Sequence, residues 1–153
     1  MKPIRNSAKA VILQENAVLL TRNRNQVGEF YQFPGGGQEK GEPLEHTVVR
    51  ECMEEIGQKV EVERLLHVRE YIGGNHPHGD LYGDIHQVEF YFACRLVEGN
   101  EAPLDNGLIP DDTQIGVEWV ELDRLSGLTV YPRRMAEMLA AGEQGPVYLG
   151  DVY

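Results

Sequence analysis

Hydrophobic and polar positions along the chain predict several β-strands. Residues 7–21 (SAKAVILQENAVLLT) hold two apolar runs separated by Gln14-Glu15-Asn16, a pattern typical of a β-hairpin. Residues 59–72 and 86–97 alternate between apolar and polar positions, which predicts two further strands. In the second of these, alternation places Val88, Phe90, Phe92 and Cys94 on one face. The other face, which is expected to point outward, carries Gln87, Glu89, Tyr91 and Ala93.

Apolar residues at helical spacing predict a helix from Leu44 to Ile56, because Pro43 suits its first turn and Gly57 its end. A second helix is predicted at 132–141, after a short strand at 116–120 and a helical turn at 122–125. Loops are expected at 21–28, 73–84 and 98–113, and the glycines after Pro34 are expected to interrupt regular structure. The C-terminal residues either add a strand or dock on the surface. We therefore expect one α/β domain over residues 1–153.

Composition and charge narrow the class of protein. The 153 residues carry a formal charge of −11, which disfavours binding to a nucleic acid polymer. No apolar run reaches the roughly 18 residues of a membrane span, and we find no signal peptide, so we expect a soluble, cytoplasmic protein without membrane contact. Cys52 and Cys94 form no disulfide framework and are expected to be buried as small hydrophobic residues.

Three carboxylates on the first predicted helix indicate a metal site. Glu51, Glu54 and Glu55 stand at i, i+3 and i+4, so they share one helix face and repel one another. Such clusters mostly form a solvated helix face. Here the helix also carries an apolar face and follows a glycine cluster, which lets backbone groups approach a cation or a phosphate closely. Hard oxygen ligands suit Mg²⁺, with Mn²⁺ as an alternative, and Arg50 is placed to brace a carboxylate.

The segment from Gly36 to Gln58 resembles the Nudix box, the signature of the Nudix hydrolase family. It supplies the glycine, glutamate and arginine positions of that signature at matching spacing: Gly36, Glu42, Arg50, Glu51, Glu54, Glu55 and Gly57. Cys52 and Gln58 depart from it at two aliphatic positions. The resemblance implies a Nudix-type α/β/α sandwich with a mixed central sheet.

The resemblance also implies the chemistry, which is hydrolysis of the diphosphate bond of a nucleoside diphosphate derivative, with ADP-ribose-like compounds first. In this reading Glu51, Glu54, Glu55 and the carbonyl of Gly36 hold Mg²⁺, and Arg50 orients Glu51 or Glu54. Glu42 is expected to be structural. The catalytic base is either Glu51 or a carboxylate outside the box, and the candidates there, otherwise expected to be solvated, are Glu89, Asp111 and Asp112.

Substrate contacts are less strongly marked. Arg22 and Arg24 are the expected basic contacts. Phe30 and Tyr31 are candidates to stack on a base, although packing is the commoner fate of such aromatic rings. His76 and His78 are expected to be loop residues that touch substrate phosphate. The alternatives are a house-cleaning nucleoside triphosphate pyrophosphatase and a non-catalytic nucleotide-binding module. The three intact carboxylates favour an enzyme, with a small nucleotide as its substrate, and the family resemblance implies a homodimer.

Overall fold

The structure of the chain is a computed structural model that describes residues 2–98 and 103–153. These residues form nine strands: β1 (Arg5–Gln14), β2 (Ala17–Arg24), β3 (Glu29–Gln32), β4 (Gly35–Gly37), β5 (Val60–Ile72), β6 (His86–Leu96), β7 (Gln114–Glu121), β8 (Val130–Tyr131) and β9 (Tyr148–Asp151). The helices are α1 (Leu44–Ile56), α2 (Gly79–Tyr82) and α3 (Arg133–Ala141), with 3₁₀ turns η1 (Gly73–Asn75) and η2 (Leu122–Gly127).

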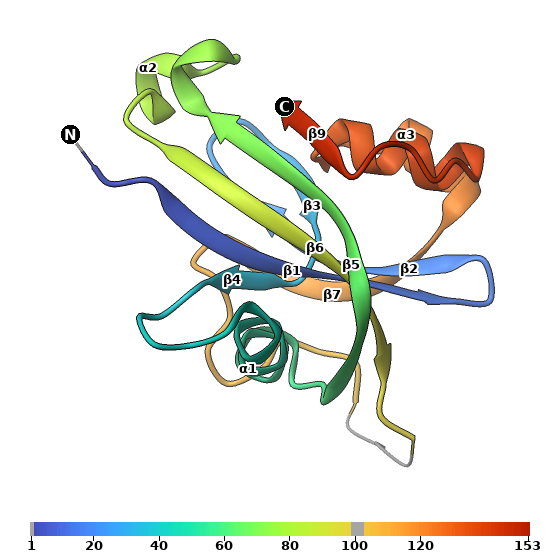
Figure 1. Cartoon of the computed structure of the whole chain (residues 1–153). Helices are drawn as coiled ribbons and strands as arrows, with labels where there is room; N and C mark the ends of the chain where they lie inside the picture. The colour runs from blue at the N-terminus through green and yellow to red at the C-terminus, as the bar shows by residue number, and fades with distance from the viewer. Residues whose placement is uncertain (1, 99–102) are drawn as a thin grey trace.

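Strand β1 organises the mixed sheet. It runs antiparallel to β2 and β4 and parallel to β6, and the main strand order is β8-β3-β2-β1-β6-β5-β9. Helices α1 and α3 lie on opposite sides of the strands (Figure 1). The predicted α/β/α sandwich with a mixed central sheet is therefore confirmed.

Helices α1 and α3 each pack on a separate hydrophobic core. The apolar face of α1, with Val48, Cys52 and Ile56, packs in the cluster that contains Ala8 and Ala10 of β1. The other cluster joins Met135 and Met138 of α3 to the opposite face of the sheet. Since both faces are covered, alternate residues of a central strand are buried in different cores.

Double burial corrects two predictions made for β6. Tyr91 was expected on an outward polar face but is 1% exposed, because that face lies in the core with α3. Glu89 was expected to be solvated but is 4% exposed, and its partners are described below.

Two predicted loop boundaries are also wrong. The triglycine forms strand β4, which pairs only with β1; at Gly35 an added Cβ would lie 2.1 Å from the carbonyl oxygen of Ala8, so the absence of a side chain allows the close approach. Strand β2 continues to Arg24 because β3 and β7 pair with it there, which shortens the predicted loop at 21–28.

Most of the other elements are confirmed. The hairpin turn lies at Glu15 and Asn16, both with positive φ, and the predicted strands at 59–72 and 86–97 match β5 and β6 within a residue. The segment 73–84 contains η1 and α2. In 98–113, residue 98 and residues 103–113 form no helix or strand, and residues 99–102 lie outside the described residues. The chain end forms β9. Within the described residues, no helix is long and apolar enough to cross a membrane.

Candidate active site

Helix α1 presents its carboxylates beside strand β4. The helix ends at Gly57, which adopts φ 65° and donates its N–H to the carbonyl of Met53 at 3.1 Å. Its buried face fixes the rotation of the helix, so Glu51, Glu54 and Glu55 all reach one cavity. Glu51 lies directly over β4, because a Cβ added to Gly36 would be 2.5 Å from its carboxyl carbon. The predicted metal ligands are therefore brought together.

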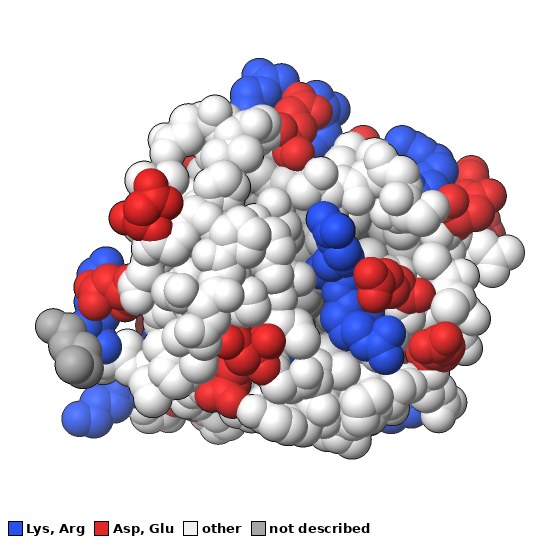
Figure 2. All heavy atoms as spheres, turned by 90° about the horizontal axis from the view of Figure 1, so that it is seen from above, with Lys and Arg blue, Asp and Glu red and all other residues white. Residues whose placement is uncertain are grey.

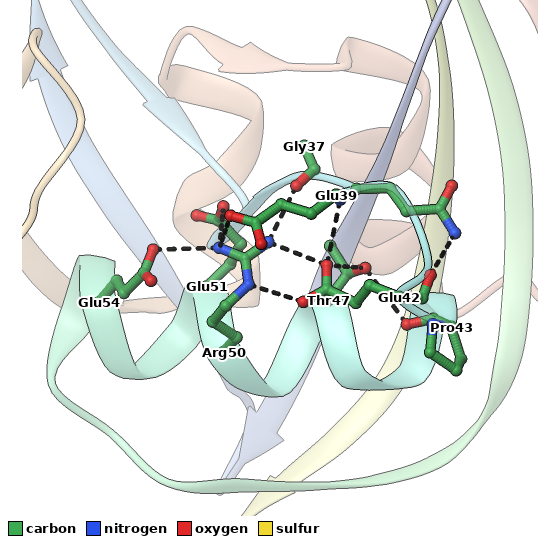
Figure 3. A network of polar contacts seen from close by, with 9 residues as sticks. Gly37, Glu39, Glu42, Pro43, Thr47, Arg50, Glu51 and Glu54 are labelled. Carbon is green, nitrogen blue, oxygen red and sulfur yellow. Dashed lines mark hydrogen bonds and ion pairs between the residues drawn. The ribbon is translucent and has the colours of Figure 1, made fainter.

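Arg50 joins the acidic residues of this segment into one network (Figure 3). Its Nε donates to Glu42 at 2.7 Å, while Nη1 donates to Glu51 at 2.9 Å and to Glu54 at 3.2 Å. Its Nη2 reaches the carbonyl of Gly37 at 3.1 Å. Hydrogen bonds from Arg50 and then from Thr47 lower the pKa of Glu42 to about 2. Arg50 thus neutralises charges that would otherwise repel one another.

Glu55 lies outside this network and is 6% exposed. Burial, followed by the charges of Asp111 and Glu51, raises its pKa to about 7, although Lys9 opposes the shift. A carboxylate held among like charges in this way gains from a nearby cation.

The donor set fits a hard divalent cation chemically, since it consists of carboxylate oxygens beside an unhindered glycine backbone. Among the described residues, however, no three acidic, His or Cys side chains already converge as a metal cage. Glu51 and Glu54 instead turn toward Arg50. Binding a cation would therefore require these two side chains to exchange part of their contact with Arg50.

The cavity that receives these carboxylates has a volume of about 990 Å³. Its floor is the face of β1, β6 and β5 where register aligns Ser7 with Glu89 and Glu89 with Arg69. Arg5 and Lys9 flank Ser7 on the same face of β1 and also line the cavity. The floor therefore brings three cations into the same cavity as the acidic residues of α1.

Glu89 and Arg69 form a buried ion pair at the centre of this floor. Arg69 Nε donates to Glu89 at 2.5 Å, and the Tyr91 hydroxyl donates to the same oxygen at 3.2 Å. Burial alone would raise the pKa of Glu89, but Arg69 and Lys9 hold it below its ordinary value. Glu89 is thus a partner of Arg69, and its lowered basicity makes it a poor proton acceptor.

The structure does not place all predicted residues at the cavity. Arg22 pairs with Glu29 at 3.3 Å, and Tyr31 is 9% exposed in the core, where its hydroxyl donates to Glu118 at 2.8 Å. Neither residue is part of the cavity wall, because both are used by the packing of β2 and β3. Asp111, Asp112 and His78 do line the cavity, whereas His76 binds Asp151 behind its wall.

Our sequence reasoning missed Arg5, Lys9 and Arg69. Arg5 and Lys9 stand four residues apart in the strand that pairs with the triglycine, and this spacing could have indicated a shared face. Arg69 had no comparable signal, because its position depends on the pairing of β5 with β6.

The segment 103–113 is anchored to the end of α1. The N–H groups of Gly107 and Ile109 donate to the carbonyls of Glu55 and Glu54 at 2.9 and 2.8 Å. Gln58, an unusual residue at its box position, is buried and donates to the carbonyl of Pro103 at 3.2 Å. The two backbone bonds satisfy helix carbonyls that have no partner within α1, and the same segment carries Asp111 into the cavity wall.

Replacing Gly107 with alanine is expected to loosen this anchor. The new Cβ would lie 2.3 Å from the carbonyl oxygen of Glu54 and 2.8 Å from the nitrogen of Gly57, so the segment must move. We expect the free energy of unfolding, measured in urea, to fall by about 1–3 kcal/mol as the backbone bonds are lost. Gly116→Ala is the control, because no atom lies within 4 Å of its added Cβ. Equal urea midpoints for both variants and the parent would contradict this account.

Comparison of the chain with known proteins places it in a single protein family. The NUDIX domain family model matches residues 3–141. The chain is 31% identical over 150 residues to the nucleoside diphosphate-linked moiety X motif 6 protein of Xenopus laevis, covering 95% of this chain and 64% of that protein. It thus spans less than two-thirds of the length of that relative.

Two further matches extend over most of both chains. The RNA pyrophosphohydrolase of Sulfurovum sp. is 31% identical over 140 residues, with 87% of each chain covered. A NUDIX hydrolase structure from Nitrosomonas europaea superposes with a TM-score of 0.70 at 19% identity, covering 95% of this chain and 94% of the other. The second match concerns the fold alone.

Proposed function

This chain belongs to the NUDIX domain family, and on that premise we propose that it hydrolyses the diphosphate bond of a nucleoside diphosphate derivative, with ADP-ribose-like compounds first. The observation that carries the proposal is that the carboxylates Glu51, Glu54 and Glu55 line the same cavity as the cations Arg5, Lys9 and Arg69. Such a site offers carboxylates to a metal ion and cations to phosphate.

We propose Mg²⁺ as the cofactor, held by Glu51, Glu54, Glu55 and the carbonyl of Gly36, with Mn²⁺ as a substitute. When bound, the ion would offset the charge of the diphosphate and lower the pKa of an attacking water. Arg50 holds Glu51 and Glu54 beside the cavity through contacts of 2.9 and 3.2 Å, part of which a bound ion would replace.

The proton acceptor is proposed among Glu51, Asp111 and Asp112. All three carboxylates line the cavity that would hold the substrate, which is the geometric requirement for a proton acceptor. Glu89 is not proposed as the proton acceptor, because its carboxylate already accepts a hydrogen bond from Arg69.

The cations of the cavity floor, Arg5, Lys9 and Arg69, support binding of the diphosphate as the common part of the substrates. The substrate is proposed to be a small nucleotide, and a homodimer remains a prediction.

Figure 2 shows the face above α2, β9 and α3, where Lys and Arg side chains gather in short groups, mostly beside Asp or Glu. This face offers no continuous basic band for a long phosphate backbone.

A substrate panel tests the proposed reaction. With Mg²⁺ present we expect ADP-ribose to be cleaved, and a monophosphate analogue such as AMP to release phosphate at least about 100-fold more slowly, because it has no phosphoanhydride bond. Nucleoside triphosphates test the alternative of a house-cleaning pyrophosphatase, and 5′-triphosphate RNA tests the activity in the name of the Sulfurovum relative. Products are separated by ion-exchange chromatography. Preferred cleavage of either triphosphate class would overturn the choice of substrate.

A further inference from the structure

The wall of the cavity formed by the rings of Phe30, Tyr71, Tyr131 and Tyr153 carries no part of the proposed hydrolytic chemistry. These rings come from β3, from β5, from β8 and from the residue two positions after β9. They form a connected set: Phe30 and Tyr131 have centroids 5.6 Å apart, Tyr131 and Tyr153 4.9 Å, and Tyr153 and Tyr71 6.5 Å. We call this set the aromatic wall.

Several contacts hold the aromatic wall in place from behind. The ring of His76 stacks on Tyr71 at 5.4 Å and on Tyr153 at 5.7 Å, and its Nε2 lies 2.6 Å from Asp151. The hydroxyls of Tyr131 and Tyr153 share a hydrogen bond of 3.2 Å. Because these rings are ordered before any ligand arrives, a ligand that packs against them pays little additional ordering entropy.

The distance from the acidic face of α1 to the aromatic wall matches the length of part of a nucleotide. The row Gly37, Ser7, Glu89 and Arg69 crosses four adjacent strands, and three strand spacings amount to about 14 Å. The guanidinium carbon of Arg69 then sits 5.3 Å from the ring centroid of Tyr71. A diphosphate followed by a ribose can span from the carboxylates across Arg69 to the aromatic wall.

We propose that the aromatic wall binds the base of the nucleotide by ring packing, and that it requires a base without selecting a particular one. This inference rests on the proposed function, since it assigns the far end of the same substrate. Aromatic packing tolerates base identity because every nucleobase has a flat π face. Arg69, fixed by Glu89 and by the carbonyl of Val152, would meet the adjoining phosphate.

Binding, measured without turnover, tests this proposal. The probe is the α,β-methylene analogue of ADP-ribose with Mg²⁺, titrated calorimetrically into the full chain, beside its uracil counterpart and an abasic counterpart with hydrogen in place of the base. We expect the two base-containing probes to bind within about 3-fold of each other and the abasic probe to bind about 10-fold more weakly or worse. Equal affinity for the abasic probe, or no binding of any probe, would overturn the proposal.

Variants of Tyr153 test whether the contribution of the base to affinity comes from the aromatic wall. Tyr153→Leu is expected to weaken the base-containing probes about 10-fold and leave the abasic probe unchanged, whereas Tyr153→Phe keeps parental affinity because it keeps the ring. Tyr148→Leu, in β9 but outside the cavity and 59% exposed, is the matched control and should bind as the parent does. A loss in Tyr153→Phe as large as in Tyr153→Leu, or an equal loss in Tyr148→Leu, would overturn the role of the wall. Because the probes resist cleavage, binding with these preferences but no hydrolysis of ADP-ribose would refute the proposed function alone.

Discussion

Glu55→Gln is expected to lose turnover by at least about 100-fold while the metal-free protein becomes more stable at pH 8. Turnover falls because the variant lacks a proposed metal ligand. Stability rises because the pKa of Glu55 is about 7 in the folded chain, against an ordinary value of 4.5. Between those values the folded state binds a proton that the unfolded state does not. The contribution of this proton to the free energy of unfolding is therefore fully present below pH 4.5 and is lost as the pH rises through 7.

The stability gain should depend on pH in a defined way. At pH 8 the parent buries an ionised Glu55 and the variant does not, so the variant should be more stable by up to about 3 kcal/mol in metal-free buffer. Near pH 4.5 the two proteins should differ little. Urea unfolding at both pH values measures this, beside turnover at saturating Mg²⁺. Glu45→Gln, on an exposed position of the same helix, is the control. Parental turnover in Glu55→Gln would mean that the acidic cluster is only a polar helix face.

Arg50→Met is expected to reduce both stability and turnover. The change removes the shared donor of Glu42, Glu51 and Glu54, so their charges repel and Glu51 loses its position over β4. We expect turnover to fall at least about 10-fold and the melting temperature to fall at pH 7.

The loss of stability in Arg50→Met should shrink in acid. Arg50 holds the pKa of Glu42 at about 2, so this carboxylate stabilises the fold above its ordinary pKa of 4.5 and ceases to do so as the pH falls through 2. Thermal melts of parent and variant at pH 7 and pH 3 measure the difference. Arg64→Met, at an exposed position, should melt as the parent does. If Arg50→Met also melts and turns over as the parent does, the network in Figure 3 has no functional role.

The acidic half of the site could be predicted from sequence because it is local. Glu51, Glu54 and Glu55 lie within five residues of one helix, and their common face follows from helical geometry alone. Pro43 and Gly57 marked the two ends of α1 in the sequence.

The opposite half could not be predicted, because it depends on which strands become neighbours. Alternation in 86–97 gave the two faces of β6 but not their surroundings, so Glu89 and Tyr91 were assigned to solvent. Arg69 meets Glu89 only through the β5–β6 register. The aromatic wall combines four segments, and the chain between Phe30 and Tyr153 is most of the protein. The cytoplasmic location stays a prediction.

The most direct test of the central claim is the hydrolysis of ADP-ribose followed by ³¹P NMR, with the metal first removed and then restored. We expect AMP and ribose 5-phosphate to appear with Mg²⁺, to stop forming in excess chelator and to form again when Mg²⁺ exceeds the chelator. Ca²⁺ should substitute poorly, because it favours larger and less regular coordination than Mg²⁺. Full turnover in excess chelator, or no AMP from ADP-ribose under any of these conditions, would contradict the account.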